Sequence, residues 1–361
     1  MTPPVGGIDP HQDTFTAGIV DHRGVEITHE TFDNTAAGYG EAIDLLDAHA
    51  VCQVGVEGSA KWGAHVAIAL TAAGFDAREV PASRSAAQRR SRQLGKTDAV
   101  DAVASARALL AEPTLGPVQT LEVYDPAVAE IEAVLEHRRA LVAARTLGLH
   151  HVADQISKLP TEIRDQLTTN GKIEARLRRL EHIDPDTDTT PAGKYRLEWL
   201  QAFIGQDRTA RREIRRLERL IDELLDRHGT TLRDEPGIGP ISAATLLCEV
   251  GDPTRFDRES KFARWCGTGA VALSSGEGAA NPVKHRLDFR GNRRINSVLH
   301  VASVTQQRTQ PQAIAYLAKK ATEGKTRREA RRAHKRQLAN RVIRRMWRDE
   351  QTRNQPFALA A

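Results

Sequence analysis

Residues 5–32 read VGGIDPHQDTFTAGIVDHRGVEITHETF. The stretch contains three short runs of apolar, β-branched and aromatic residues, at 5–9, 14–20 and 25–32, with polar turn residues between them. Runs of this length and composition are typical of strands. The stretch therefore predicts three strands that follow one another directly along the chain.

After these strands the pattern changes to strand and helix in alternation. Further strands are predicted at 51–57 and 77–80, and helices at 37–48, 62–73, 83–93 and 98–110. Such an order predicts an α/β domain in which a mixed sheet is covered by flanking helices. The breaks Glu112-Pro113 and Gly116-Pro117 then end the pattern. We expect this first domain to span residues 1–118.

The middle of the chain, residues 119–230, has a helical pattern. Asp125 and Pro126 suit the cap and first position of a helix. Apolar residues keep a seven-residue register between Val128 and Leu159, and a second run extends from Ile214 to Leu224. The pattern predicts antiparallel coiled-coil helices with a loop at 184–194 between them. It leaves open whether they pair within one chain or between chains.

The last region, residues 231–361, is expected to be a mainly α-helical domain. The turn PGIGP at 236–240 precedes an apolar helix at 241–250. It fits two interpretations: backbone N–H groups at a helix start that bind a phosphate, or a plain tight turn before a helix. A Gly/Ser/Ala-rich loop follows at 267–282, then a helix from about residue 291 and a basic helix at 325–348.

Charge is distributed unevenly. Residues 1–111 hold nine Lys/Arg against fourteen Asp/Glu, whereas residues 284–361 hold twenty against five. The helix at 325–348 has eleven Lys/Arg and one acid, which indicates nucleic-acid contact because solvated helix faces usually mix both signs. The candidates are Lys325, Arg327, Arg328, Arg331, Arg332, Lys335 and Arg336. A smaller cluster before residue 98 contains Arg89, Arg90 and Arg92.

Composition excludes several other classes of protein. The chain has 361 residues, 40% of them hydrophobic and 27% charged, and no apolar run long enough for a membrane span. The first ten residues lack the pattern of a secretory signal, and the three cysteines lack metal-site spacing. We expect a soluble, cytoplasmic protein without membrane contact.

Four acids stand at positions where a sheet and a helix can bring carboxylates together. Asp9 and Glu57 end predicted strands, while Asp98 and Asp101 lie three residues apart at a helix start and so share one helix face. Taken singly, each acid also suits a turn or a helix dipole. Together they predict a Mg²⁺ site, because Mg²⁺ prefers a few carboxylates plus water and phosphate oxygens.

Three motifs carry a family resemblance: GID at 7–9, GVEG at 55–58 and KTDAVDA at 96–102. They resemble the Asp-Glu-Asp-Asp signature of the DEDD insertion-sequence transposases, also called bridge recombinases, whose first domain is a RuvC-like ribonuclease-H fold. The helical middle is similar to the family's coiled-coil insert. PGIG at 236–239, SSG at 274–276 and RGN at 290–292 resemble its C-terminal transposase domain. The resemblance covers nearly the whole chain.

The resemblance implies a mechanism and partners. The four acids would bind Mg²⁺, and a serine would attack DNA and form a covalent phosphoserine intermediate. That serine corresponds to Ser275, with Ser274 as the adjacent alternative. Double-stranded DNA, a structured noncoding guide RNA and further copies of the chain, as a dimer or tetramer, would be the partners.

Two other functions fit the same residues. A RuvC-like, metal-dependent nuclease or resolvase would use the carboxylates to activate water, and the serine would take no part in the reaction. A non-catalytic nucleic-acid-binding protein would use only the basic regions.

Overall fold

The computed structural model describes residues 3–59, 62–91, 95, 97–113, 115–118, 125–167, 173–188, 190–272, 285–287 and 291–354. The chain divides into two compact units, Met1–Pro126 and Ala127–Ala361. Each unit is described on its own.

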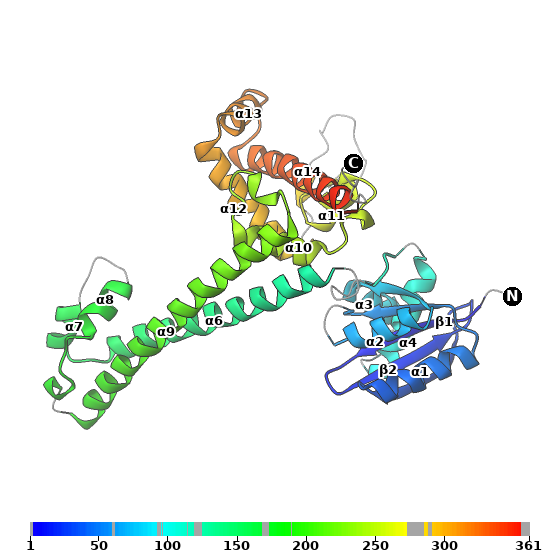
Figure 1. The fold of residues 1–361 in the computed structure, drawn as a ribbon, viewed down its shortest axis with the longest axis horizontal. Helices are drawn as coiled ribbons and strands as arrows, with labels where there is room; N and C mark the ends of the chain where they lie inside the picture. Colours follow the sequence, from blue (N-terminus) through cyan, green and yellow to red (C-terminus); the bar gives the residue numbers. More distant parts are fainter. Residues whose placement is uncertain are drawn as a thin grey trace, which may run out of the picture. The chain divides into compact units, whose positions relative to one another are not determined.

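The first unit is built on a five-stranded mixed sheet (Figure 1). The strands lie in the order β3-β2-β1-β4-β5; β1, β2 and β3 are antiparallel, and β1, β4 and β5 are parallel. Their bounds are β1 Val5–Pro10, β2 Thr14–Val20, β3 Glu26–Asp33, β4 Gln53–Glu57 and β5 Asp76–Val80. The helices are α1 Ala36–Ala48, α2 Ala64–Ala72, α3 Ala82–Ser91 and α4 Asp98–Ala111.

Alternate residues of β1 face different helices. A Cβ added at Gly6 would meet Leu46 of α1, whereas one added at Gly7 would meet the backbone of α4. One core therefore joins Ile8 to α1 and α2, and a second core joins Val5 to α4. Since side chains of a strand alternate between faces, Asp9 lies on the side of α4.

Three glycines let α4 approach the sheet closely. An added Cβ would lie 2.2 Å from the Ala102 carbonyl oxygen at Gly7, 2.9 Å from the Val103 nitrogen at Gly18, and 3.0 Å from the Ser105 carbonyl oxygen at Gly55. These contacts are with backbone atoms, which cannot move aside as a flexible side chain can. The position of α4 over β1, β2 and β4 therefore depends on the missing side chains.

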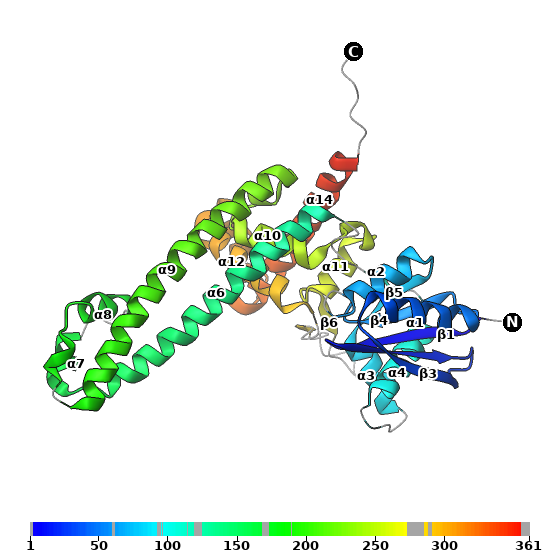
Figure 2. The ribbon, with the colours of Figure 1, turned by 60° about the horizontal axis from the view of Figure 1, so that its bottom comes forward.

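The second unit contains two long helices, α6 Pro126–Ser157 and α9 Pro191–His228, which lie side by side (Figures 1 and 2). They are antiparallel, since Val152 of α6 shares a core with Leu197 of α9, while Arg227 at the end of α9 pairs with Glu130 near the start of α6. The short helices α7 Thr161–Leu167 and α8 Ile173–Leu180 lie between them in sequence.

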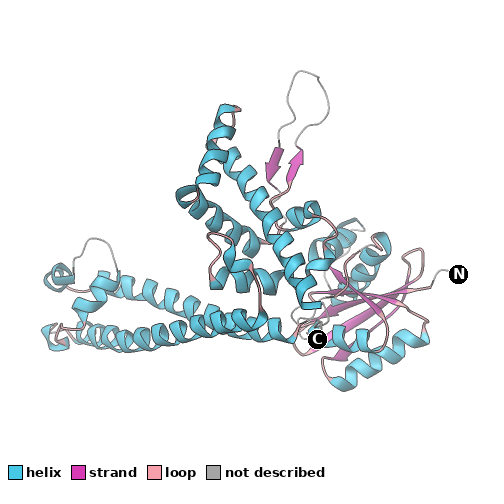
Figure 3. Ribbon diagram, turned by 45° about the horizontal axis from the view of Figure 1, so that its top comes forward, coloured by secondary structure: helices cyan, strands magenta, loops and turns pink. Residues whose placement is uncertain are grey.

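In its described residues, the rest of the second unit is helical apart from one pair of strands, β6 Ala270–Ala272 and β7 His285–Leu287, which are antiparallel (Figure 3). The α-helices are α10 Pro240–Val250, α11 Glu259–Trp265, α12 Arg293–Thr309, α13 Pro311–Thr322 and α14 Arg327–Asn354. Three 3-10 turns complete the unit: η1 Pro185–Thr187, η2 Leu232–Asp234 and η3 Pro253–Arg255.

The predicted fold class is confirmed by the strand order, the flanking helices and the helical second unit. Local expectations differ at a few places. The loop expected at 184–194 ends earlier, because Thr190 caps α9 and Pro191 is its first residue. The helical pattern of residues 119–230 did not give the bounds of the short helices α7 and α8, and α11 and the β6–β7 pair were not predicted; each of these elements is eight residues or shorter. Within the described residues, no helix has the length and apolar character that a membrane crossing requires.

The glycine contacts predict a large effect of one methyl group. Gly7→Ala should lower the free energy of unfolding by about 3 kcal/mol or more, because the new Cβ would overlap backbone atoms of α4. Gly40→Ala is the matched control: Gly40 lies in α1 with nothing near its added Cβ, and the change should stabilise the fold by about 0.5–1 kcal/mol. Denaturant unfolding measures both, and similar stabilities would contradict the close approach.

Candidate active site

Two of the four predicted acids come from neighbouring parallel strands. In the register of β1 and β4, Val5 pairs with Gln53 and Ile8 with Val56, so Asp9 and Glu57 are the next residues along each strand. Adjacent strands are about 4.8 Å apart and paired residues point to one face. Both carboxylates therefore lie at the same edge of the sheet, on the side of α4.

The other two acids come from the first turn of α4. The Thr97 hydroxyl accepts a hydrogen bond from the Val100 N–H and fixes the start of the helix. The Asp101 side chain is 7% exposed, whereas that of Asp98 is 58% exposed. Asp101 is therefore buried in the first unit, whereas Asp98 lies at its surface.

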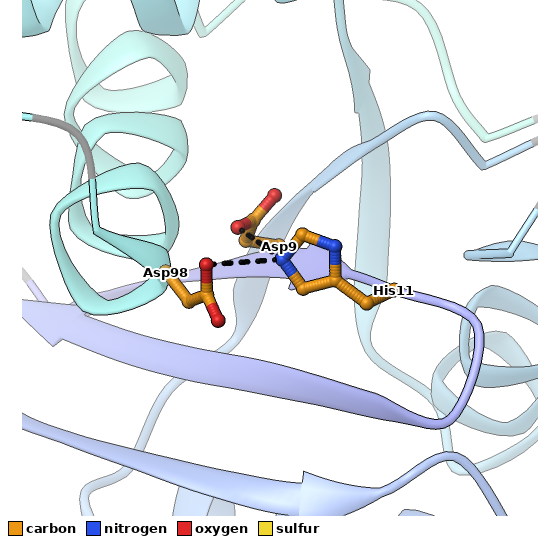
Figure 4. Close-up of side chains that lie close together, drawn as sticks. All are labelled: Asp9, His11 and Asp98. Atoms are coloured by element: carbon orange, nitrogen blue, oxygen red, sulfur yellow. Dashed lines mark ion pairs between the residues drawn. The ribbon is translucent and has the colours of Figure 1, made fainter.

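His11 joins this group and was not among the predicted residues. Its Nε2 lies 3.3 Å from Asp9 Oδ2 and 3.1 Å from Asp98 Oδ1, as the dashed lines of Figure 4 show. The three side chains could hold one cation, because a donor atom of each lies within 4.8 Å of the others. The available sequence signal was the position of His11, two residues after Asp9 in the turn that ends β1.

The pKa of Asp9 records the same clustering. The pKa is raised from 3.8 to about 6, mainly by burial; the negative charges of Asp101, Glu57 and Asp98 contribute to the increase and His11 opposes it. A carboxylate in a low-dielectric pocket with three others nearby is costly to ionise. A cation at the site would remove that cost.

Helix α3 supplies partners for the remaining two acids. The Ser85 hydroxyl donates to Glu57, and the Arg89 guanidinium forms an ion pair with Asp101. These residues are four positions apart and so share one face of α3. Arg89, predicted to contact nucleic acid, is thus engaged with an acid of its own domain; Arg90 is exposed, and Arg92 lies outside the described residues.

The residues present fit a divalent cation. Asp9 Oδ2 and His11 Nε2 are both buried, and within the described residues neither makes a hydrogen bond; their contacts are the ion pair with each other and that of His11 with Asp98. Buried polar atoms normally have partners. Carboxylate oxygens are the donors that Mg²⁺ prefers, and the imidazole is a donor that softer divalent ions also accept.

The predicted serine cannot be placed. Ser275 and its neighbour Ser274 lie outside the described residues, between β6 and β7. The described backbone gives the register of the two flanking strands, in which Ala272 pairs with His285.

The basic residues predicted near the C-terminus differ in their surroundings. Lys325, Arg327 and Arg328 are exposed, Arg331 and Arg332 are half-buried, and Lys335 is buried. Arg336 donates a hydrogen bond to the Glu259 carbonyl oxygen. Further along α14, three arginines pair with acids of other segments: Arg341 and Arg345 with Glu235, and Arg344 with Glu259. Only part of this basic helix is therefore without an internal acidic partner.

The pKa of Asp9 predicts how divalent-ion binding depends on pH. Protons compete with the cation below about pH 6, so Mg²⁺ affinity at pH 5 should be about tenfold weaker than at pH 7. Asp9→Asn should remove both the binding and its pH dependence. Because the pKa of Asp9 is higher in the folded chain than in the unfolded chain, its ionisation lowers the free energy of unfolding as pH rises from 3.8 to about 6. At pH 7 without added ion, Asp9→Asn removes this charge and should therefore stabilise the fold by about 2 kcal/mol. Calorimetric titration and denaturant unfolding measure these effects; equal affinities at the two pH values would contradict them.

The ion pair on α3 gives a second prediction. Arg89→Gln should increase Mg²⁺ affinity about fivefold, because Asp101 loses a competing cation. Arg84→Gln is the control: Arg84 lies on the same helix but pairs with Glu112, 3.0 Å away. An unchanged affinity in both variants would show that Asp101 takes no part in holding the ion.

Comparison with known proteins gives matches in both units. The family model described as "Transposase", of the DEDD IS110 type, matches residues 6–158, and the one described as "Transposase IS116/IS110/IS902 family" matches residues 229–318. The insertion element IS110 uncharacterized 43.6 kDa protein of Streptomyces coelicolor is 29% identical over 151 residues. That alignment spans 41% of this chain and 36% of the relative.

Among solved structures, RuvC of T. thermophilus in complex with a Holliday junction substrate aligns with 32% of this chain over 99% of its own length, with a TM-score of 0.27 and 17% identity. A second Thermus thermophilus RuvC structure gives a TM-score of 0.26 and 16% identity over the same shares. The two transposase matches contain all four DEDD acids and the segment between β6 and β7. The chain belongs to the IS110/IS116/IS902 family of DEDD transposases.

Proposed function

We propose that this chain is a DNA recombinase of an insertion sequence, which cuts and rejoins DNA through a covalent phosphoserine intermediate. The observation that carries the proposal is the group formed by Asp9, Asp98 and His11, with Glu57 and Asp101 close enough to raise the pKa of Asp9. Family membership supports the reaction class.

The four acids would hold divalent cations, which we propose to be Mg²⁺ because oxygen donors predominate. When bound, such ions neutralise a phosphodiester and favour ionisation of a hydroxyl near it. The chain's own part is to fix the acids in place: α4 presents Asp98 and Asp101, and the strand ends present Asp9 and Glu57.

Ser275 would be the nucleophile. A new bond forms between its Oγ and the phosphorus as one P–O bond of the DNA breaks, which leaves a hydroxyl on the other DNA end. A hydroxyl of a second DNA end then reverses the step and frees the serine. The number of phosphoester bonds is conserved, so rejoining needs no external energy source.

The partners we propose are double-stranded DNA, a structured noncoding guide RNA and further copies of the chain as a dimer or tetramer. The excess of basic residues in 284–361 supports contact with nucleic acid. We further propose three functional regions, 1–118, 119–230 and 231–361, with the antiparallel α6 and α9 forming a coiled coil in the second.

Covalent trapping tests the serine chemistry. With duplex DNA carrying the element's ends and RNA transcribed from its noncoding flank, the wild-type chain should form a protein–DNA adduct that survives denaturation. Ser275→Ala should abolish the adduct, and the adjacent Ser274→Ala should retain it. Asp98→Ala and Asp101→Ala should each slow adduct formation at least about 100-fold.

Other outcomes would point elsewhere. Cleavage by Ser275→Ala at the wild-type rate would support a metal-dependent nuclease that uses water. If Asp98→Ala and Asp101→Ala leave every activity of the wild-type chain unchanged, the chain is a nucleic-acid-binding protein without catalysis.

A further inference from the structure

Helix α14 has two parts that differ in how their cations are neutralised. In its second half, Arg341, Arg344 and Arg345 each pair with an acid. Four cations lie close together in its first half: Arg328, Arg331, Arg332 and Lys335. Within the described part of the chain, no carboxylate forms an ion pair with any of them.

These four cations line a pocket of about 370 Å³ together with His300 of α12. Arginine and lysine side chains offer only donors, so a ligand of this pocket must be rich in acceptors. Among the described residues of the lining, His300 is the one aromatic side chain, which argues against stacking of a nucleobase. The pocket therefore suits a compact anion with several oxygens.

Lys335 makes the pocket costly when it is empty. The residue is 6% exposed, and its Nζ donates to Asn296 Oδ1 at 2.7 Å, a neutral acceptor. Burial lowers the pKa of its ammonium. A buried cation without an acidic partner destabilises a fold, and a bound anion would offset that effect.

Asn296, which accepts the hydrogen bond from Lys335, also contacts the backbone just before the β6–β7 pair. Asn296 Nδ2 donates to the carbonyl oxygens of Cys266 and Gly267, at 2.9 and 3.1 Å. Gly267 lies three residues before β6. The side chain of Asn296 thus links Lys335 to the backbone that immediately precedes β6.

We propose that this pocket seats one backbone phosphate of a nucleic acid, held by Lys335 and the three arginines, at the base of the β6–β7 pair. The proposal rests on the proposed function, since that function brings nucleic acid to the chain. It goes further by assigning the contact to one phosphate and to named side chains. The guanidinium groups are suited to the task because their planar N–H groups match phosphate oxygens in pairs.

Binding of labelled duplex DNA and of labelled structured RNA at several salt concentrations tests the proposal. Arg332→Gln and Lys335→Met should each weaken binding about 5- to 20-fold and reduce the slope of log affinity against log salt by about one. Arg348→Gln is the matched control, because Arg348 is exposed on the same helix, outside the pocket, and the change removes the same charge. It should weaken binding less than about twofold.

Thermal melting separates ligand binding from a structural role of Lys335. Lys335→Met should melt at the same temperature as the wild type or above it, because it removes a buried charge. A lower melting temperature, or pocket variants that bind like Arg348→Gln, would overturn the proposal.

The two nucleic acids identify the source of the phosphate. Loss confined to DNA or to RNA names the strand that fills the pocket, and equal loss means that both can fill it. Failure of the proposed function is seen separately, as absence of the Ser275-dependent adduct in the wild-type chain.

Discussion

The close contact between α4 and the sheet is the constraint on which the acidic site depends. An added Cβ at Gly7 would lie 2.2 Å from the Ala102 carbonyl oxygen, and Ala102 directly follows Asp101. A side chain at position 7 would push the first turn of α4 away from β1. The absence of one methyl group thus sets how near the acids of the helix come to Asp9. Catalytic groups need positions fixed to a fraction of an ångström, and backbone contact provides that more firmly than side-chain packing.

Holding four acids on a rigid frame has an electrostatic consequence. Burial, together with repulsion between the charges, raises the pKa of Asp9, and the frame does not let the acids move apart. The fold limits the repulsion locally: Arg89 pairs with Asp101, Ser85 donates to Glu57, and His11 lies between Asp9 and Asp98. Arg89 and Ser85 each contact a carboxylate oxygen that a divalent ion would otherwise contact, whereas His11 offers a further ligand atom. The site is therefore assembled in advance, at an energetic cost that a bound cation would reduce.

Much of the first unit could be predicted from sequence because its signals are local. Strand length, strand order and the i, i+3 spacing of Asp98 and Asp101 are visible within short windows. What could not be predicted depends on contacts between distant residues. His11 has no local pattern, and the pairing of Arg89 with Asp101 requires α3 to lie on α4. The basic count of α14 also does not show which cations have partners inside the fold, since Glu235 and Glu259, which pair with Arg341, Arg344 and Arg345, lie about a hundred residues away.

The two halves of α14 show how one helix can serve both folding and binding. Leu338, Val342, Ile343 and Met346 are buried along its length and anchor it in the core of the second unit. Arginines near these residues form internal ion pairs, so they add little to the field that an approaching phosphate experiences. Among the residues that the structure describes, no carboxylate forms an ion pair with Arg328, Arg331, Arg332 or Lys335 of the first half, and these cations remain strongly attractive to anions. The fold thus concentrates unneutralised positive charge at one pocket, as it concentrates negative charge around Asp9. A ligand of opposite charge would bind favourably at each of these two clusters, because it reduces the repulsion between like charges that the fold holds close together.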